Sequence, residues 1–115
     1  MSTQTLWKES LRNNAMKTFN MSQLFGAVCG DGTRAVGFLQ SDVLPALNES
    51  EAVQFDFSGV KVLNSSFSNA LFGNLIKIKG QDVLKSIKIA KATYFVRSEI
   101  KSGILYGAKH QNEAA

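Results

Sequence analysis

The sequence has very few of the side chains from which catalytic and metal sites are usually built. Cys29 is its only cysteine and His110 its only histidine. This composition argues against an internal disulfide, a thiol-rich metal site and a histidine-based catalytic triad. No apolar run approaches the ~20 residues that span a bilayer, and the first residues lack the apolar block of a signal peptide. We therefore expect a cytoplasmic protein that needs no cofactor.

Proline is equally scarce, with one residue, and the nine glycines are not gathered in a low-complexity tract. A chain of 115 residues with 44% hydrophobic side chains is the size of one domain with its own core. The sequence predicts an N-terminal extension at residues 1–16, either flexible or a short helix. It further predicts one domain at 17–110 and a tail at 111–115.

Charge is unevenly distributed along the chain. The net charge is +4, and residues 77–109 hold many lysines against only Asp82 and Glu99. A basic region permits an anionic partner, so a small domain that binds nucleic acid through residues 77–109 is an alternative function. Lysines spaced along amphipathic elements are also typical of a solvated face.

Hydrophobic periodicity predicts an alternation of strands and helices. Strands are expected at Lys17–Met21, Ala52–Phe57 and Ser86–Ala90, and helices at about 36–48, 66–78 and 93–108. This order is typical of an α/β domain with a mostly parallel or mixed sheet and helices packed on it.

The central strand and helix have clear apolar faces. Val53, Phe55 and Phe57 alternate along the predicted central strand. One stripe of the helix that follows it comprises Phe67, Leu71, Leu75 and Ile78. A glycine inside a helix is unfavourable by about 1 kcal/mol relative to alanine. We expect a close approach of this helix to the sheet to compensate for Gly73, and Gly103 and Gly107 to form a groove for a neighbour.

The glycine-rich segment Gly26–Arg34 reads as a loop. Its "GDGTRA" is the loosest form of a dinucleotide fingerprint, without a convincing strand before it. Arg34 is a candidate anchor for an anion or a partner, or it pairs with Asp31. Cys29 is more typical of an inert thiol than of a reactive one. In the next helix, Ser41 as N-cap would place Pro45 in the first turn, where its missing N–H is no loss.

Two adjacent serines, Ser65 and Ser66, lie between a predicted strand and the start of the helix that follows it. Helix N-termini favour negative charge, so a phosphoserine would be stabilised there. Asn64, Ser65 and Ser66 are equally residue types that cap helices, and the sequence leaves both interpretations open. Asp56, at the end of the strand, more often fixes a turn than acts as a functional carboxylate. A serine nucleophile is a weaker possibility, because no base is visible.

The stretch "FDFSGVKVLNSS" resembles the STAS domain, the fold of the bacterial anti-sigma factor antagonists. Their pattern is a strand that ends in aliphatic–Asp–aromatic, a short loop, then Asp-Ser-Ser/Thr-Gly and a helix. Still closer is the STAS-like family of small bacterial proteins, whose pattern is matched in order by "GDGTR", "VLPAL", "SSF" and "LFGNL". The resemblance spans about residues 17–109.

The resemblance implies a non-enzymatic regulatory module that docks a protein partner, such as a histidine-kinase-like ATPase or serine kinase, or an anti-sigma factor. It implies phosphorylation at Ser65, with Ser66 as the second choice. Two positions depart from the pattern of the antagonists: Asn64 replaces the aspartate before the serines, and Phe67 replaces the glycine after them. The partner-binding residues implied within 58–69 are Ser58, Asn64, Ser65, Ser66, Phe67, Ser68 and Asn69.

Overall fold

Three parallel strands form the main sheet of the computed structural model, which describes residues 16–50 and 52–110. They are β1 (Met16–Asn20), β3 (Ala52–Asp56) and β5 (Ile87–Ala90), in the order β1–β3–β5. Phe19, Phe55 and Ile89 lie side by side across the sheet. The predicted α/β class and all three predicted strands are confirmed, with β3 in the centre. The first strand ends at Asn20, because Met21 already belongs to a helix.

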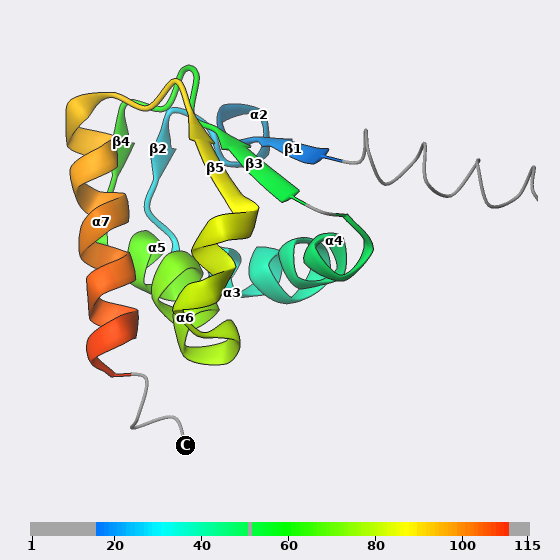
Figure 1. The fold of residues 1–115 in the computed structure, drawn as a ribbon. Coiled ribbons are helices and arrows are strands. Elements are labelled where there is room, and N and C mark those ends of the chain that lie inside the picture. Colours follow the sequence, from blue (N-terminus) through cyan, green and yellow to red (C-terminus); the bar gives the residue numbers. More distant parts are fainter. Residues whose placement is uncertain (1–15, 51, 111–115) are drawn as a thin grey trace, which may run out of the picture.

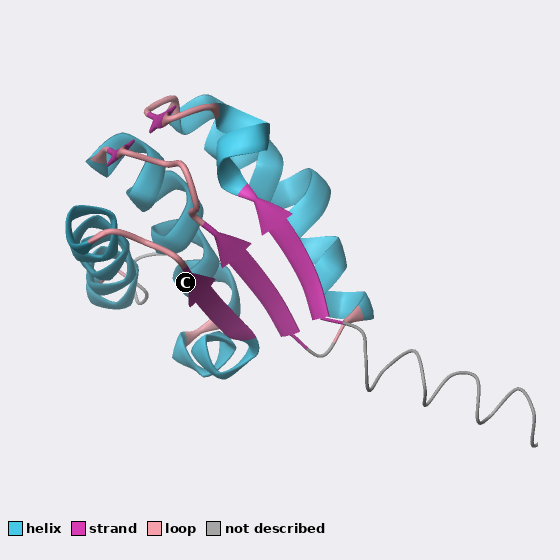
Figure 2. Ribbon diagram, turned by 90° about the horizontal axis from the view of Figure 1, so that it is seen from above, coloured by secondary structure: helices cyan, strands magenta, loops and turns pink. Residues whose placement is uncertain are grey.

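The two faces of this sheet differ in polarity. Phe19, Val53 and Phe55 point to the helices and are buried, whereas Gln54 and Lys88 lie on the opposite face. Figure 2 shows this second face from above, with the helices behind the strands. The helices therefore cover one side of the sheet and leave a polar side uncovered in the described part of the chain.

A second, smaller sheet was not predicted. It pairs β2 (Val28–Cys29) with β4 (Val62–Leu63) in parallel. The prediction that Gly26–Arg34 is a loop is therefore wrong in part, since this segment holds β2 and the start of a helix. Two-residue strands are too short to show a periodicity of their own.

The helix after β2 runs without a break from Gly32 to Glu49. Its three parts are α3 (Gly32–Phe38), the π-helical η1 (Leu39–Val43) and α4 (Leu44–Glu49). Ser41 lies inside this run, so the prediction that it is an N-cap is wrong. In the π turn the N–H of Leu44 donates to the carbonyl of Leu39. Pro45 follows in the first turn of α4, where its missing N–H is tolerated.

The helix after β4 is built in the same way. It comprises α5 (Ser65–Ser68), the π-helical η2 (Asn69–Gly73) and α6 (Asn74–Lys79). Phe67, Leu71 and Leu75 are fully buried, as predicted. Ile78 was predicted on the same stripe but is 56% exposed, and Ile76 is buried in its place. The wider π turn shifts the face of every residue that follows it.

The last helix, α7 (Tyr94–Lys109), has Thr93 as its predicted N-cap, whose side chain accepts a hydrogen bond from the N–H of Val96. The backbones of Gly73, Gly103 and Gly107 meet where α7 crosses η2 and α6. The close approach predicted for Gly73 is therefore to α7, not to the sheet. Gly103 and Gly107 do form the predicted groove.

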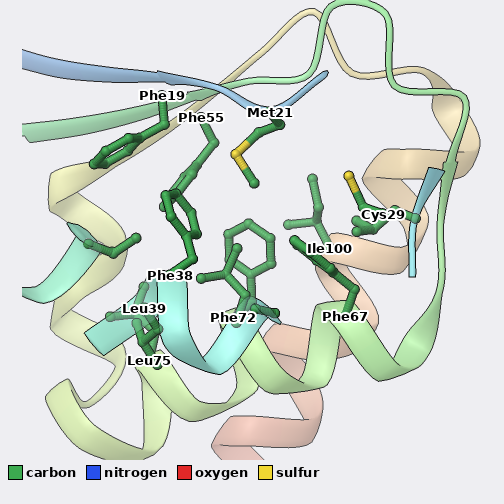
Figure 3. Close-up of a cluster of buried hydrophobic side chains, with 14 of the residues drawn as sticks. Phe19, Met21, Cys29, Phe38, Leu39, Phe55, Phe67, Phe72, Leu75 and Ile100 are labelled. Carbon is green, nitrogen blue, oxygen red and sulfur yellow. The ribbon is translucent and has the colours of Figure 1, made fainter. Parts of the chain in front are cut away.

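Two short helices complete the described chain: α2 (Met21–Phe25) and the 3-10 helix η3 (Gln81–Ser86). Between sheet and helices, phenylalanine rings from several elements interlock; Phe55, for instance, lies 5.3 Å from Phe72, centroid to centroid. Figure 3 shows this cluster. None of the helices in residues 16–50 and 52–110 is long and apolar enough to cross a membrane. The predicted N-terminal extension, apart from Met16, and the tail at 111–115 lie outside the described residues.

Candidate functional site

Two helices begin side by side at the ends of β2 and β4. Because these strands are parallel and pair Cys29 with Leu63, the next residues of both lie together at one end of the pair. Asp31 caps the first helix and Asn64 caps the second. Figure 1 shows β2 and β4 entering the helical layer next to each other. We refer to β2 with residues 30–49 as the first unit, and to β4 with residues 64–79 as the second unit.

Two hydrogen bonds of Asn64 join the two units, and a third caps the second helix. Its side-chain oxygen accepts from the N–H of Phe67 at 2.9 Å, which is the capping bond. Its side-chain amide donates to the carbonyl of Gly30 at 3.2 Å, and its backbone N–H donates to the carbonyl of Cys29 at 3.1 Å. A carboxylate cannot make the bond to Gly30, because it has no N–H. The asparagine that departs from the antagonist pattern therefore has a structural role here.

Ser65 and Ser66 lie on the first turn of the second helix and are both exposed. Neither hydroxyl makes a hydrogen bond within the described part of the chain. Capping is carried by Asn64, so of the three candidate caps only this one is used. Ser66 lines a shallow hollow of about 670 Å³ with Gly30, Asp31 and Thr33 of the first unit. The backbone of the two serines is thus fixed in the fold, but their hydroxyls contribute no hydrogen bond to it.

Not all residues implied by the family pattern are on that surface. Phe67 and Ser68 are fully buried, and the Ser68 hydroxyl donates to the carbonyl of Glu99 in α7. Their prediction as partner-binding residues is wrong, because the helix turns these two positions towards the core. Asn69 is partly buried. Ser58 is exposed, but it precedes β4 while the serine pair follows it.

The first unit contributes groups that sequence reasoning missed as part of a site. The Asp31 carboxylate accepts the N–H groups of Thr33 and Arg34. A methyl group added to Gly32 would come within 3.1 Å of the Ser66 carbonyl, so the two helix starts are in close contact. The signal available in the sequence was "DGT", an N-cap residue type before a helix.

Arg34 binds neighbours of its own fold. Its guanidinium donates to the carbonyl of Leu24 at 3.0 Å and lies 5.0 Å from the centre of the Phe25 ring. The alternative pairing with Asp31 is not present, since that carboxylate bonds to backbone N–H groups. Arg34 as an anchor for an anion or a partner stays a prediction.

Two further polar candidates have structural environments. Asp56 accepts the N–H of Ser58 at 2.9 Å and so fixes the turn, as expected. Cys29 is fully buried, and burial raises the pKa of its thiol although the nearby charge of Arg34 lowers it. A buried thiol with a raised pKa is a poor nucleophile at neutral pH. Within residues 16–50 and 52–110, no three His, Cys, Asp or Glu side chains gather as metal ligands.

Comparison with known proteins identifies one family. Residues 39–94 match the model of a family described as a STAS-like domain of unknown function (DUF4325). This segment contains β3, the second unit and β5. The predicted resemblance to the STAS-like family is confirmed over these residues. No curated protein and no solved structure matches the chain significantly.

Proposed function

We propose that this chain, with its STAS-like segment at 39–94, is a regulatory module that acts by binding a protein partner rather than by catalysis. The docking surface consists of Asn64, Ser65 and Ser66, with Asn69 at its border. One observation carries this proposal: two exposed serine hydroxyls without hydrogen bonds, on a turn whose backbone is fixed by Asn64. Loops that follow parallel strands are where ligands and partners engage in α/β folds.

Phosphorylation of one serine is the proposed switch. A phosphoryl group adds about −1.5 to −2 charges at neutral pH and three strong acceptor oxygens. The start of a helix stabilises negative charge, so a phosphate on Ser65 is compatible with the fold. Ser66 shares its hollow with the Asp31 carboxylate, which repels a phosphate. We therefore propose Ser65 as the modified residue.

The partner we propose is a histidine-kinase-like ATPase of the serine-kinase or anti-sigma type, as the family resemblance implies. Such a partner brings its own ATP, so this chain has no need of a cofactor. Serine catalysis is disfavoured by geometry, since a serine nucleophile needs an adjacent base. His110 follows the last residue of α7 and packs on Tyr106 with 4.4 Å between ring centroids and the rings tilted by 45°.

Nucleic-acid binding through residues 77–109 stays the alternative, and no single observation favours it. The basic side chains of this region are divided among α6, η3, β5, the bend at Lys91 and α7. One of them, Lys77, lies 5.1 Å from the centre of the Tyr106 ring. Nucleic-acid sites usually concentrate such charges along one stripe.

The test compares Ser65→Asp with wild type in affinity capture from the native cell, followed by calorimetry with the protein retained. The carboxylate imitates part of the phosphate charge, and we expect it to weaken partner binding at least tenfold. The fold should persist, because aspartate near a helix N-terminus is favourable by about 0.3–1 kcal/mol.

Ser102→Asp is the matched control, since Ser102 is also exposed but lies on α7. It should leave the affinity unchanged. Equal partners and affinities for wild type, Ser65→Asp and Ser66→Asp would show that the serine pair is not a switch. Phosphopeptide analysis of the chain from its own cells then locates the modified hydroxyl.

A further inference from the structure

The β5 edge of the main sheet is open. In the described chain β5 pairs with β3 on one side and with no strand on the other. Half of the backbone N–H and C=O groups of an edge strand point away from its partner and are able to pair with another chain. Figure 2 shows the strands of this sheet side by side, with no further strand of the described chain beside either edge strand.

A groove lies between this edge and α7. It has a volume of about 610 Å³, and its apolar wall is formed by Ile89 of β5 with Ile100 and Ile104 of α7. The ring of Tyr94 also lines the groove and is 78% exposed. Ile89 points to the core side of the sheet, in line with Phe19 and Phe55. A strand added to β5 would therefore direct every second side chain into this groove.

The charges on the wall of the groove are positive. Arg97 and Lys101 line it one helical turn apart, and both are exposed. Lys88 follows on the strand itself and is exposed on the other face of the sheet. In the described part of the chain, none of these three side chains forms an ion pair; the one ion pair found there joins Lys85 to Asp82.

We propose that an extended, acidic segment of another protein binds here by adding a strand to β5. Its backbone pairs with the open edge, alternate apolar side chains fill the space beside Ile89, Ile100 and Ile104, and its carboxylates meet Arg97 and Lys101. Strand addition of this kind takes its affinity from main-chain hydrogen bonds and its specificity from the pockets for alternate side chains. This surface is distinct from the one that contains the serines, and the inference does not rest on the proposed function.

The charge pattern decides between occupants. A second copy of this chain would bring the same cations to the edge, and like charges facing each other oppose association. Residues 1–15 carry Lys8 and Arg12 against Glu9, so this segment is not acidic either. A nucleic acid has the right charge but no backbone that pairs with a strand edge, and it leaves the isoleucine wall without a partner.

The experiment selects a random eight-residue peptide library displayed on phage against the full chain. Peptides that also bind the variant Arg97→Glu/Lys101→Glu are removed. We expect the retained peptides to alternate apolar residues and to carry Asp or Glu. As synthetic peptides they should bind the double variant at least tenfold more weakly than wild type. Amide resonances should shift along residues 87–90 and on the adjoining face of α7.

Lys79→Glu/Lys109→Glu is the matched control, because it changes the charge equally at exposed positions that do not line the groove. This variant should bind the selected peptides as wild type does. The proposal is overturned if no acidic peptide is retained, or if both double variants lose affinity equally. It is also overturned if the amide shifts fall outside β5 and α7. Tighter binding of a single-stranded oligonucleotide to the same residues, or dimerisation through β5 in sedimentation, would assign the groove to a different occupant.

Discussion

The first and second units, whose helices are capped by Asp31 and Asn64, have the same construction but differ in how far their helices are covered. Each has a two-residue strand, a cap with a side-chain oxygen, and a helix that contains a five-residue π segment. The first helix keeps Leu44 and Leu47 only partly buried, whereas the second buries Leu71, Leu75 and Ile76 completely. The second is covered by α7 as well as by the sheet, and the first is not.

The glycines of the first unit and of α7 differ in the space around them. A methyl group added to Gly37, in the first unit, would meet no atom within 4 Å. The same methyl group on Gly103, in the helix that covers the second unit, would overlap the side chain and backbone of Ser68. Both helices bury core residues, and the first contributes Phe38, Leu39 and Val43. The comparison teaches that the second helix is packed from two sides, by the sheet and by α7, whereas α7 does not cover the first.

The largest difference between the units should appear on leucine truncation. Leu71→Ala removes a fully buried side chain, and we expect a loss of about 2–5 kcal/mol in the free energy of unfolding. Leu47→Ala in the first unit should lose less than half as much, because Leu47 is partly exposed. Urea denaturation of both variants measures the difference. Equal losses would mean that Leu47 contributes as much to the core as Leu71.

Alanine at the two glycines should have effects of opposite sign. We expect Gly103→Ala to destabilise by about 1–3 kcal/mol or more, because the contact with Ser68 leaves no room for a methyl group. Gly37→Ala should stabilise by about 0.5–1 kcal/mol, since alanine is the better helix former. Thermal unfolding of the two variants reports both signs. A stable Gly103→Ala protein would contradict the close contact of α7 with the second unit.

The smallest difference concerns the caps. Asn64→Asp keeps the capping oxygen but loses the bond to Gly30 and places a carboxylate against that carbonyl. We expect the free energy of unfolding of this variant to fall by about 1 kcal/mol. Asp31→Asn should remain within about 0.5 kcal/mol of wild type, because asparagine and aspartate cap equally well. Asn64→Ser separates capping from the link between the units. If Asn64→Asp were as stable as wild type, the hydrogen bond to Gly30 would contribute nothing to the stability of the fold.

The central strand β3 and the helix of the second unit could be predicted from the sequence, because both are long enough to show a hydrophobic period. Val53, Phe55 and Phe57 alternate, and Phe67, Leu71 and Leu75 recur at helical spacing. The error at Ile78 has a local cause. The π turn at Asn69–Gly73 is wider than an α-helical turn, so the buried face after it no longer follows the regular helical period. Hydrophobic spacing reports such a shift only after the turn has been located.

The candidate site was predictable only on one side. The serine pair and its helix followed from "NSSF", but the facing loop was read as irregular because its glycines concealed a short strand. Asn64 was among the candidate caps, but its link to the first unit was not predicted, since the partners there are the carbonyls of Cys29 and Gly30, more than thirty residues earlier in the chain. Contacts of this range depend on the pairing of β2 with β4, and strands of two residues have no hydrophobic pattern from which that pairing could be predicted.

The bonds of Asn64 also bear on how the proposed docking surface would meet a partner. Because one side chain fixes both helix starts, the turn that carries Ser65 and Ser66 already has its final shape before any encounter. Little conformational entropy remains to be lost there on association, and the free energy of contact is correspondingly less diminished. The surface would then engage a partner as a rigid body, and a charge added at Ser65 would alter the interaction through electrostatic repulsion rather than by reshaping the loop.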